Sequence, residues 1–321
     1  MDTKGKVLTY LMDNMEINVS GEKIANELNI SRTAIWQAIN KLKEMGHNIE
    51  SNGNKGYRYI QSDIISKEGI RHYLSQDNRD ITIKYFDEIE STNKQAKIDA
   101  PMIKDEKTIY VTGYQTGGYG RFSRSFVGEK DGGIYISIIL KPQSIVEDIP
   151  LITIKTAVAA KEAIDDLAGA DVRIKWVNDL FLNNKKISGI LTEGVTDYES
   201  GTISTIIIGI GINFFIEKFP KELEKIAGSI FDKKPQDVTK NQLIGKFINN
   251  FFTIFGSKEN KEILDKYRKA LFILGREVTF IKNNENYKGI ATDITESGEL
   301  IVILDNKEKM ILNSGEISIK L

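Results

Sequence analysis

Three short amphipathic segments follow one another within the first 46 residues, and this pattern constrains the fold more than any other feature of the sequence. Apolar residues in each segment recur at the three- and four-residue spacing of a buried helical stripe. Ser20 and Ser31 stand where they can cap the second and third helices, and Gly46 can end the third. The stripes consist of Val7, Leu8, Leu11 and Met12, then Ile24, Ala25 and Leu28, and finally Ile35, Ile39, Leu42 and Met45. Three short helices in this order predict a helix-turn-helix.

Two strand-like runs follow at 48–51 and 57–60, and Asn52-Gly53 between them readily supplies the positive φ angles of a tight hairpin, which would form a wing. Residues 31–60 carry five basic and two acidic residues, a net of +3, whereas residues 1–30 carry a net of −2. This local charge favours DNA binding over the alternative of a protein-interaction module. The side chains predicted to meet DNA are Ser31, Arg32, Thr33, Trp36, Gln37, Asn40, Lys41, Lys55 and Arg58.

A larger body with mixed strand and helix patterns follows a polar stretch near 62–80. The alternation of apolar residues at 134–140 predicts a half-buried strand, the spacing at 149–168 predicts a helix, and 172–176, 187–195 and 202–209 predict further strands. Beyond residue 272, turn signals at Asn283-Asn284 and Ser297-Gly298 separate short strands, as in a small β barrel. The predicted class is α+β. Its domains are a winged helix-turn-helix at 1–62, a linker at 63–80, a central mixed-sheet domain at 81–270 and a C-terminal barrel at 271–321.

Composition excludes several classes of protein. The chain has no cysteine and two histidines, which rules out disulfides and thiolate metal sites and argues against a zinc enzyme. Its 44 basic and 45 acidic residues give no overall attraction to nucleic acid or to an anionic membrane. The N-terminus lacks an apolar signal core, so we expect a cytoplasmic protein with no membrane partner.

A glycine-rich loop with two arginines occupies residues 115–124, QTGGYGRFSR. Its glycines let backbone N–H groups approach a ligand, and Arg121 and Arg124 offer forked donors for phosphate or carboxylate oxygens. No Walker A loop or complete dinucleotide fingerprint occurs. Further along come KWVND at 175–179 and KKISGILTE at 185–193, where a lysine can neutralise charge between a carboxylate and a phosphate. Taken singly, each of these motifs also has a purely structural interpretation.

In family order, these segments resemble those of the biotin protein ligases, and the preceding winged helix makes the chain similar to the bifunctional members that also repress the biotin operon. The resemblance runs over nearly the whole length. It rests on Ser91-Thr92-Asn93, the 115–124 loop, KWVND, KKISGILTE, GIGIN at 209–213 and GEIS at 315–318. It implies a class II synthetase-like catalytic domain and an SH3-like C-terminal barrel.

The resemblance also implies site residues. Arg121 and Lys186 would be catalytic. Biotin would be bound by Ser91, Thr92, Asn93, Gln115, Tyr119, Gly120, Arg121 and Lys186. ATP and the adenylate would be bound by Gly118, Arg121, Arg124, Phe126, Asn178, Asp179, Asn213, Glu316 and Lys320. No metal site is firmly assigned, although Mg²⁺ accompanying ATP would have Asp179 as a candidate ligand.

This chain departs from the family pattern at several positions. Tyr119 replaces the first arginine of the family loop, Ser123 its last glycine, Phe126 a tryptophan, Val177 the proline of KWPND and Lys320 a familiar arginine. The activity implied is ATP-dependent formation of biotinyl-5′-AMP and transfer of biotin to a lysine of a carboxylase's biotin carboxyl carrier domain. Operator DNA and a homodimer formed with bound biotinyl-AMP are the other implied partners. A lipoate-type ligase and a non-catalytic biotin-sensing transcription factor are the alternatives.

Overall fold

The computed structural model describes residues 1–103, 107–126, 129–141, 149–196, 203–257, 259–313, 315 and 317–319. Contacts divide the chain into two units. The first combines Met1–Arg79 with Pro235–Lys246, and the second combines Asp80–Lys234 with Phe247–Leu321. A short segment late in the sequence therefore belongs with the N-terminal residues.

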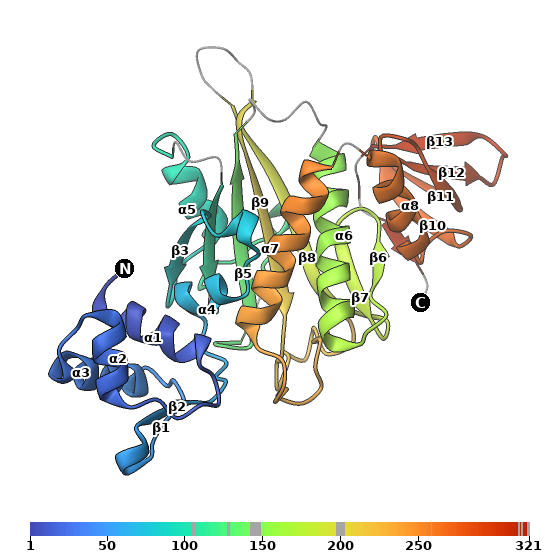
Figure 1. The fold of residues 1–321 in the computed structure, drawn as a ribbon. Helices are drawn as coiled ribbons and strands as arrows, with labels where there is room; N and C mark the ends of the chain where they lie inside the picture. The colour runs from blue at the N-terminus through green and yellow to red at the C-terminus, as the bar shows by residue number, and fades with distance from the viewer. Residues whose placement is uncertain are drawn as a thin grey trace. The chain divides into compact units, whose positions relative to one another are not determined.

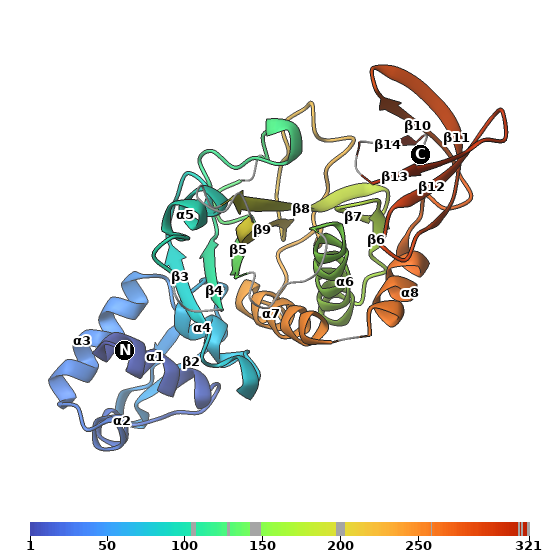
Figure 2. The same cartoon turned by 90° about the horizontal axis from the view of Figure 1, so that it is seen from above.

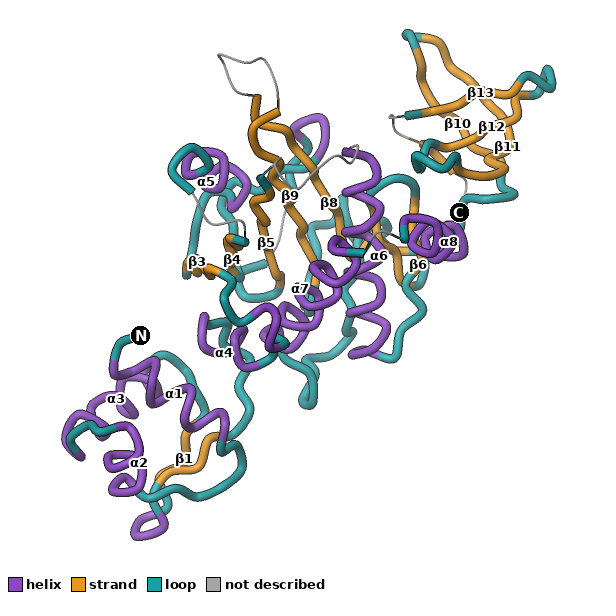
Figure 3. Tube along the Cα trace, turned by 45° about the horizontal axis from the view of Figure 1, so that its top comes forward, coloured by secondary structure: helices purple, strands orange, loops and turns teal. Residues whose placement is uncertain are grey.

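The first unit contains the predicted winged helix-turn-helix, with helices α1 (Thr3–Asp13), α2 (Gly21–Leu28) and α3 (Arg32–Glu44) followed by strands β1 (Ile49–Ser51) and β2 (Tyr57–Tyr59) (Figure 3). Ser20 and Ser31 cap α2 and α3 as predicted, accepting hydrogen bonds from the backbone N–H groups of Lys23 and Ala34. Their side chains satisfy donors that the first turn of a helix leaves free.

Two details of the prediction for this unit are wrong. Met45 is 41% exposed because α3 ends at Glu44 and Met45 is its C-cap, beyond the buried stripe. The wing is not a tight hairpin at Asn52-Gly53: residues 52–56 connect β1 and β2 through a 3₁₀ turn. Positive φ angles occur at Gly53 and Gly56, whereas Asn52 has a φ of −103°.

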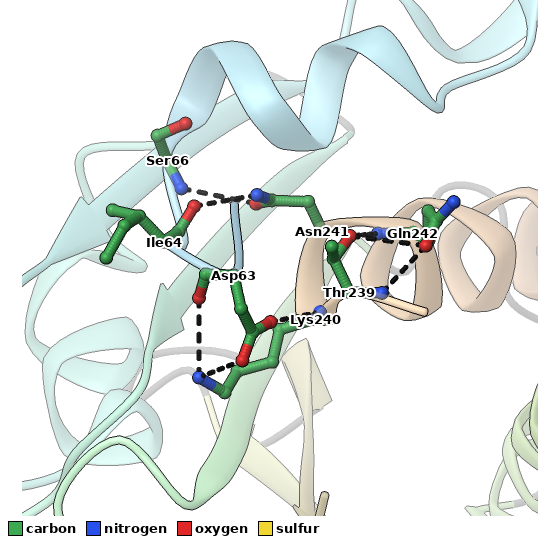
Figure 4. Close-up of polar contacts among 7 residues, drawn as sticks. All are labelled: Asp63, Ile64, Ser66, Thr239, Lys240, Asn241 and Gln242. Carbon is green, nitrogen blue, oxygen red and sulfur yellow. Dashed lines mark hydrogen bonds and ion pairs between the residues drawn. The ribbon is translucent and has the colours of Figure 1, made fainter. Parts of the chain in front are cut away.

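Residues 63–80 contain helix α4 (Lys67–His72) and a 3₁₀ turn at Gln76–Asn78. The chain just before α4 is hydrogen-bonded to the start of α7 (Lys240–Gly256) (Figure 4). Asp63 Oδ1 accepts from the backbone N–H of Lys240 at 2.8 Å, and Asn241 Nδ2 donates to the Ile64 carbonyl at 2.7 Å. These contacts hold Pro235–Lys246 within the first unit.

The second unit is built on a seven-stranded mixed sheet in the order β3-β4-β5-β9-β8-β7-β6. The β3 and β4 strands pair in parallel and the other pairs are antiparallel. The strands are β3 (Thr82–Phe86), β4 (Thr108–Thr112), β5 (Gly133–Leu140), β6 (Arg173–Lys175), β7 (Asp179–Leu182), β8 (Lys185–Thr196) and β9 (Ile203–Asn213). Every residue of β5 is buried, so the prediction of a half-buried strand there is wrong. A strand in the middle of a sheet with helices on both faces has no solvent-facing side.

Helices cover the two faces of this sheet. On one face α5 (Thr92–Asp99) packs against β4, β5 and β9. On the other, α6 (Ile149–Ala168) packs against β7 and β8, and α7 runs beside α6 (Figures 1 and 2). Helix α8 (Asn260–Ala270) packs against α6 and β6. None of the helices in the described ranges has both the length and the apolarity that crossing a membrane requires.

The C-terminal strands form a separate antiparallel sheet in the order β13-β12-β11-β10-β14. They are β10 (Glu277–Lys282), β11 (Glu285–Ile294), β12 (Leu300–Leu304), β13 (Lys309–Leu312) and β14 (Ile317–Ile319). Asn283, Asn284 and Gly298 adopt positive φ angles at the two predicted turns. The sheet is barrel-like but not closed, since no pairing joins β13 to β14 over the described residues.

Candidate active site

A pocket of about 140 Å³ lies in the second unit. Twelve of the side chains and loop residues predicted for the site line it: Ser91, Thr92, Asn93, Gln115, Tyr119, Gly120, Arg121, Arg124, Phe126, Asn178, Asp179 and Lys186. They come from the start of α5, the end of β4, the glycine-rich loop, the β6–β7 turn and β8. The fold therefore brings together segments that are up to a hundred residues apart in the sequence.

The floor of the pocket is made by two glycines on neighbouring strands, Gly189 of β8 and Gly211 of β9, which face each other in register. The Phe126 ring lies directly against them, since a Cβ atom at Gly211 would be 2.7 Å from its Cε1 atom. Tyr135 on β5 meets the same ring edge-on, with centroids 6.1 Å apart. Burial raises the pKa of Tyr135 to about 12, so its hydroxyl stays protonated at neutral pH. Tyr135 and both glycines could not be predicted as site residues, because a strand pattern alone does not show which face meets a ligand.

One wall of the pocket is polar and already internally bonded. Ser91 caps α5, which places Thr92 and Asn93 in the first turn of that helix with their side chains buried. The Thr92 backbone N–H and hydroxyl both donate to Gln115 Oε1, at 2.7 and 3.0 Å. These bonds fix the amide of Gln115, whose nitrogen then lies against Gly118.

The glycine-rich loop folds back on itself beside this wall. Tyr119 and Ser125 form an isolated antiparallel bridge, and the Gly120 N–H donates to the Arg124 carbonyl at 2.8 Å. At the tip, Phe122 and Ser123 both have positive φ, and the Phe122 side chain is 69% exposed. Non-glycine residues reach this backbone region at a cost, so the tip is the strained part of the loop.

Two cationic side chains are held by adjacent residues of the β6–β7 segment. Arg121 donates to Asn178 Oδ1 at 3.3 Å, and Lys186 Nζ lies 2.7 Å from Asp179 Oδ1. Of the described residues lining the pocket, Asp179 alone carries a carboxylate. In the described ranges no group of three or more metal-ligating side chains gathers. The pocket thus combines a neutral hydrogen-bonding wall with positive charge suited to an anionic ligand.

Two predicted residues, Gly118 and Asn213, do not line the pocket, and two others lie outside the described residues. Gly118 lies in the loop behind Gln115, and Asn213 is buried at the end of β9, where its Nδ2 donates to the Gly228 carbonyl at 2.9 Å. Asn213 Oδ1 is buried and has no hydrogen-bond partner within the described structure. Glu316 and Lys320 lie outside the described residues.

The candidate DNA-binding side chains lie in the other unit. Arg32, Thr33, Trp36, Gln37 and Lys41 are exposed on α3, together with Ser31 before the helix and Lys55 in the wing, and Asn40 is partly exposed. Trp36 has 56% of its surface exposed, which is unusual for tryptophan. Arg58 differs from the rest because its guanidinium contacts Glu16 and also lies 3.9 Å from Glu50.

Comparisons with known proteins give a family for each part of the chain. The biotin/lipoate A/B protein ligase family model matches residues 85–213, a helix-turn-helix domain model matches 4–58, and the biotin protein ligase C-terminal domain model matches 273–320. The bifunctional ligase/repressor BirA of Bacillus subtilis is 38% identical over 92% of this chain and 92% of its own length. This chain belongs to the biotin protein ligase family. Its three matched segments place it with the members that carry a helix-turn-helix domain.

More distant relatives share the architecture. The bifunctional ligase/repressor BirA of Escherichia coli is 24% identical over 98% of this chain and 96% of its own length. Among solved structures, the biotin protein ligase of Aquifex aeolicus in complex with biotin and ATP has a TM-score of 0.64 and 23% identity. It covers 74% of this chain and 98% of its own. At that identity the match supports the fold of the part of the chain that it covers.

Proposed function

We propose that this chain is a biotin protein ligase and a biotin-responsive transcriptional repressor. The pocket would bind biotin and ATP, and α3 with the wing would bind operator DNA. The observation that carries the proposal is that one pocket combines the bonded wall around Thr92, Asn93 and Gln115 with the cations Arg121 and Lys186. A ureido ring needs fixed donors and acceptors, whereas a carboxylate and a phosphate need positive charge.

In the first step a biotin carboxylate oxygen attacks the α-phosphorus of ATP, and pyrophosphate leaves as biotinyl-5′-AMP forms. Lys186 would hold the biotin carboxylate and Arg121 would hold the α-phosphate. Their positive charges would offset the repulsion between the two anions as they approach. Mg²⁺ would neutralise the phosphate oxygens. Asp179, which carries the carboxylate among the described residues of the pocket, would hold this ion together with the phosphate oxygens.

In the second step the amine of a lysine on a biotin carboxyl carrier domain attacks the carbonyl of the mixed anhydride, and AMP leaves with the phosphate oxygen. The anhydride must be kept from water until then. The 117–124 loop would close over it, with Tyr119 and Gly120 against biotin, Gly118 and Arg124 near the phosphate, and Phe126 with Asn213 toward the adenine.

For repression, two copies of the winged helix would read a two-fold operator, which requires a homodimer. We expect biotinyl-AMP to favour the dimer by ordering the 117–124 loop. Sedimentation with and without biotin plus ATP checks this coupling, and an unchanged mass in both conditions would contradict it.

Incubation with radiolabelled biotin, ATP and a biotin carboxyl carrier domain tests the catalytic proposal. Label should appear on the carrier domain, with release of pyrophosphate and AMP. Transfer of lipoate in preference to biotin would identify the lipoate-type alternative. Biotin binding without pyrophosphate release would identify a non-catalytic sensor.

A further inference from the structure

Glu193, near the end of β8, joins two parts of the site that the sequence treats separately. Its Oε2 atom accepts hydrogen bonds from Asn93 Nδ2 at 2.9 Å and from the Tyr119 hydroxyl at 3.1 Å. Its Oε1 atom lies 2.7 Å from Lys97 Nζ. One carboxylate thus contacts the pocket wall, the glycine-rich loop and the exposed side of α5.

The bond to Asn93 sets the orientation of an amide in the wall. A carboxylate only accepts, so the amide nitrogen must face Glu193 and the amide oxygen must face Ser137, whose Oγ lies 2.5 Å away. A Cβ atom on Gly209 would lie 2.4 Å from that oxygen, so the glycine leaves room for the amide to lie on β9. Ser137 and Asn93 are almost fully buried, where an unsatisfied polar group is expensive.

The orientation of Asn93 extends to Ser137. Ser137 has one hydroxyl proton, and it donates this proton toward Asn93 Oδ1 and Thr92 Oγ1, which lie 2.5 and 2.7 Å from its Oγ. The Thr92 hydroxyl gives its own proton to Gln115 Oε1, which also accepts from the Thr92 backbone N–H. Gln115 is therefore oriented by the first turn of α5, whereas Glu193 orients Asn93 and, through it, Ser137.

Glu193 also anchors the loop. Tyr119 replaces an arginine of the family loop, and its hydroxyl is held by Glu193 while Lys97 Nζ lies 3.3 Å from the same oxygen. The Lys97 ammonium lies 5.8 Å from the centre of the Tyr119 ring. Burial and the Glu193 charge raise the pKa of Tyr119, which keeps it a hydrogen-bond donor.

We propose that Glu193 is a positioning residue that fixes the orientation of the Asn93 amide in the pocket wall, and that it tethers the loop through Tyr119. The inference rests on the proposed function, since it assigns Glu193 a role in recognising a ligand with fixed donors and acceptors. Its chemical target is the ureido ring of biotin, which offers N–H donors and a carbonyl acceptor.

The first experiment measures kcat and KM for biotin, together with biotin binding by calorimetry, in Glu193→Gln and in the control Glu277→Gln. Glu277 pairs with Lys288 in the C-terminal sheet. A glutamine at 193 has one acceptor oxygen for three donors, so the Asn93 amide loses its fixed orientation. KM and Kd for biotin should rise about tenfold with kcat changed less than threefold, and the control should match the wild-type protein.

Tyr119→Phe separates the two roles, because it removes the loop tether and leaves the Asn93 bond in place. Trypsin cleavage after Arg121 and Arg124 in the ligand-free protein should become several times faster in Tyr119→Phe and in Glu193→Gln, because both lose the bond between the loop and β8. Ser137→Ala keeps that bond and should be cleaved at the wild-type rate. A wild-type rate of cleavage in Glu193→Gln would overturn the tether.

Reciprocal rescue tests the direction of the bonds. Asn93→Asp alone places two carboxylates together and should abolish measurable biotin binding. Asn93→Asp with Glu193→Gln restores a donor facing an acceptor and should make biotin binding measurable again, and a double variant that still fails to bind biotin would contradict the role of Glu193. Ser137→Ala, a small change that should fold, removes the donor to Asn93 and should raise KM as Glu193→Gln does.

The two proposals fail in different ways. If the wild-type protein neither binds biotin nor releases pyrophosphate, the proposed function is wrong. If the wild-type protein does both, yet Glu193→Gln and Ser137→Ala bind biotin within twofold of wild type, Glu193 does not fix the orientation of the Asn93 amide.

Discussion

The pocket wall and the surface of α3 differ in whether their side chains are held in place before a ligand binds. In the wall, Thr92, Asn93 and Ser137 are buried and bonded to one another before any ligand arrives. On α3, Arg32 and Gln37 project into solvent from a single helix. Bonded side chains are ordered in advance, so binding does not have to order them, whereas exposed side chains lose their freedom only on contact. Substitutions in the wall should therefore be non-additive, and those on α3 nearly additive.

The largest effect expected is the loss of catalysis in Lys186→Ala, which tests whether chemistry is confined to the pocket. Removing a charge that stabilises the transition state should slow biotinyl-AMP formation by about 10²–10³-fold, measured by pyrophosphate release. Lys185→Ala is the matched control, since the neighbouring lysine does not line the pocket. Equal slowing of pyrophosphate release in the two variants would contradict the assignment of Lys186.

The next largest effect is on stability. Leu42→Ala tests whether the winged helix can unfold while the pocket stays folded. Leu42 is fully buried in the core of that unit, so its truncation should lower the free energy of unfolding by about 3 kcal/mol. Denaturant unfolding followed by Trp36 fluorescence in a Trp176→Phe background measures it. Pyrophosphate release at low denaturant should persist, and its loss together with the Trp36 transition would show that the two units do not unfold separately.

Acid should also distinguish the two regions, because both histidines of the chain lie in the first unit. Burial, and then the nearby charge of Lys4, lower the pKa of His47 from 6.5 to about 4. The unfolded chain takes up a proton below pH 6.5 and the folded unit does so only near pH 4, so stability falls as the pH falls through this window. Between pH 7 and pH 5 the loss should be about 2 kcal/mol.

Unfolding titrations at several pH values measure this loss, and His47→Gln should flatten the dependence. Nε2 of His47 is buried with no hydrogen-bond partner in the described structure, which agrees with a neutral ring. A His47→Gln variant that keeps the full pH dependence would trace the acid sensitivity to other groups.

The comparison also explains how much could be predicted from the sequence. Periodicity and capping residues are local signals, so the predicted helices around 24–28 and 35–42 and at 149–168 are confirmed. The residues predicted to project from α3 are exposed or partly exposed. The motifs of the pocket were found as well, because each is contiguous. The burial predicted for Met45 is wrong because a stripe does not show where its helix ends.

The connections between motifs could not be predicted. Glu193 was seen as the last letter of KKISGILTE, and nothing in the sequence shows that it meets Asn93, which is 100 positions away. Tyr119 was seen as a departure from the family loop, and its partner Lys97 lies outside every motif. Long-range hydrogen bonds depend on sheet order, and sheet order leaves no local trace in the residues that form the bonds.

The smallest effect expected concerns Ser31, which has a structural role as the cap of α3 and a predicted role in DNA binding. Its hydroxyl accepts from the Ala34 N–H at 3.2 Å, so Ser31→Ala should lower the free energy of unfolding by about 1 kcal/mol, whereas Ser31→Gly should lower it by a few tenths. Both variants remove the hydroxyl equally. Operator affinity, measured by fluorescence anisotropy, should fall by the same factor in both if Ser31 contacts DNA. If affinity falls in the alanine variant alone, the hydroxyl acts by stabilising the first turn of α3. Ser31 would then not be a DNA contact.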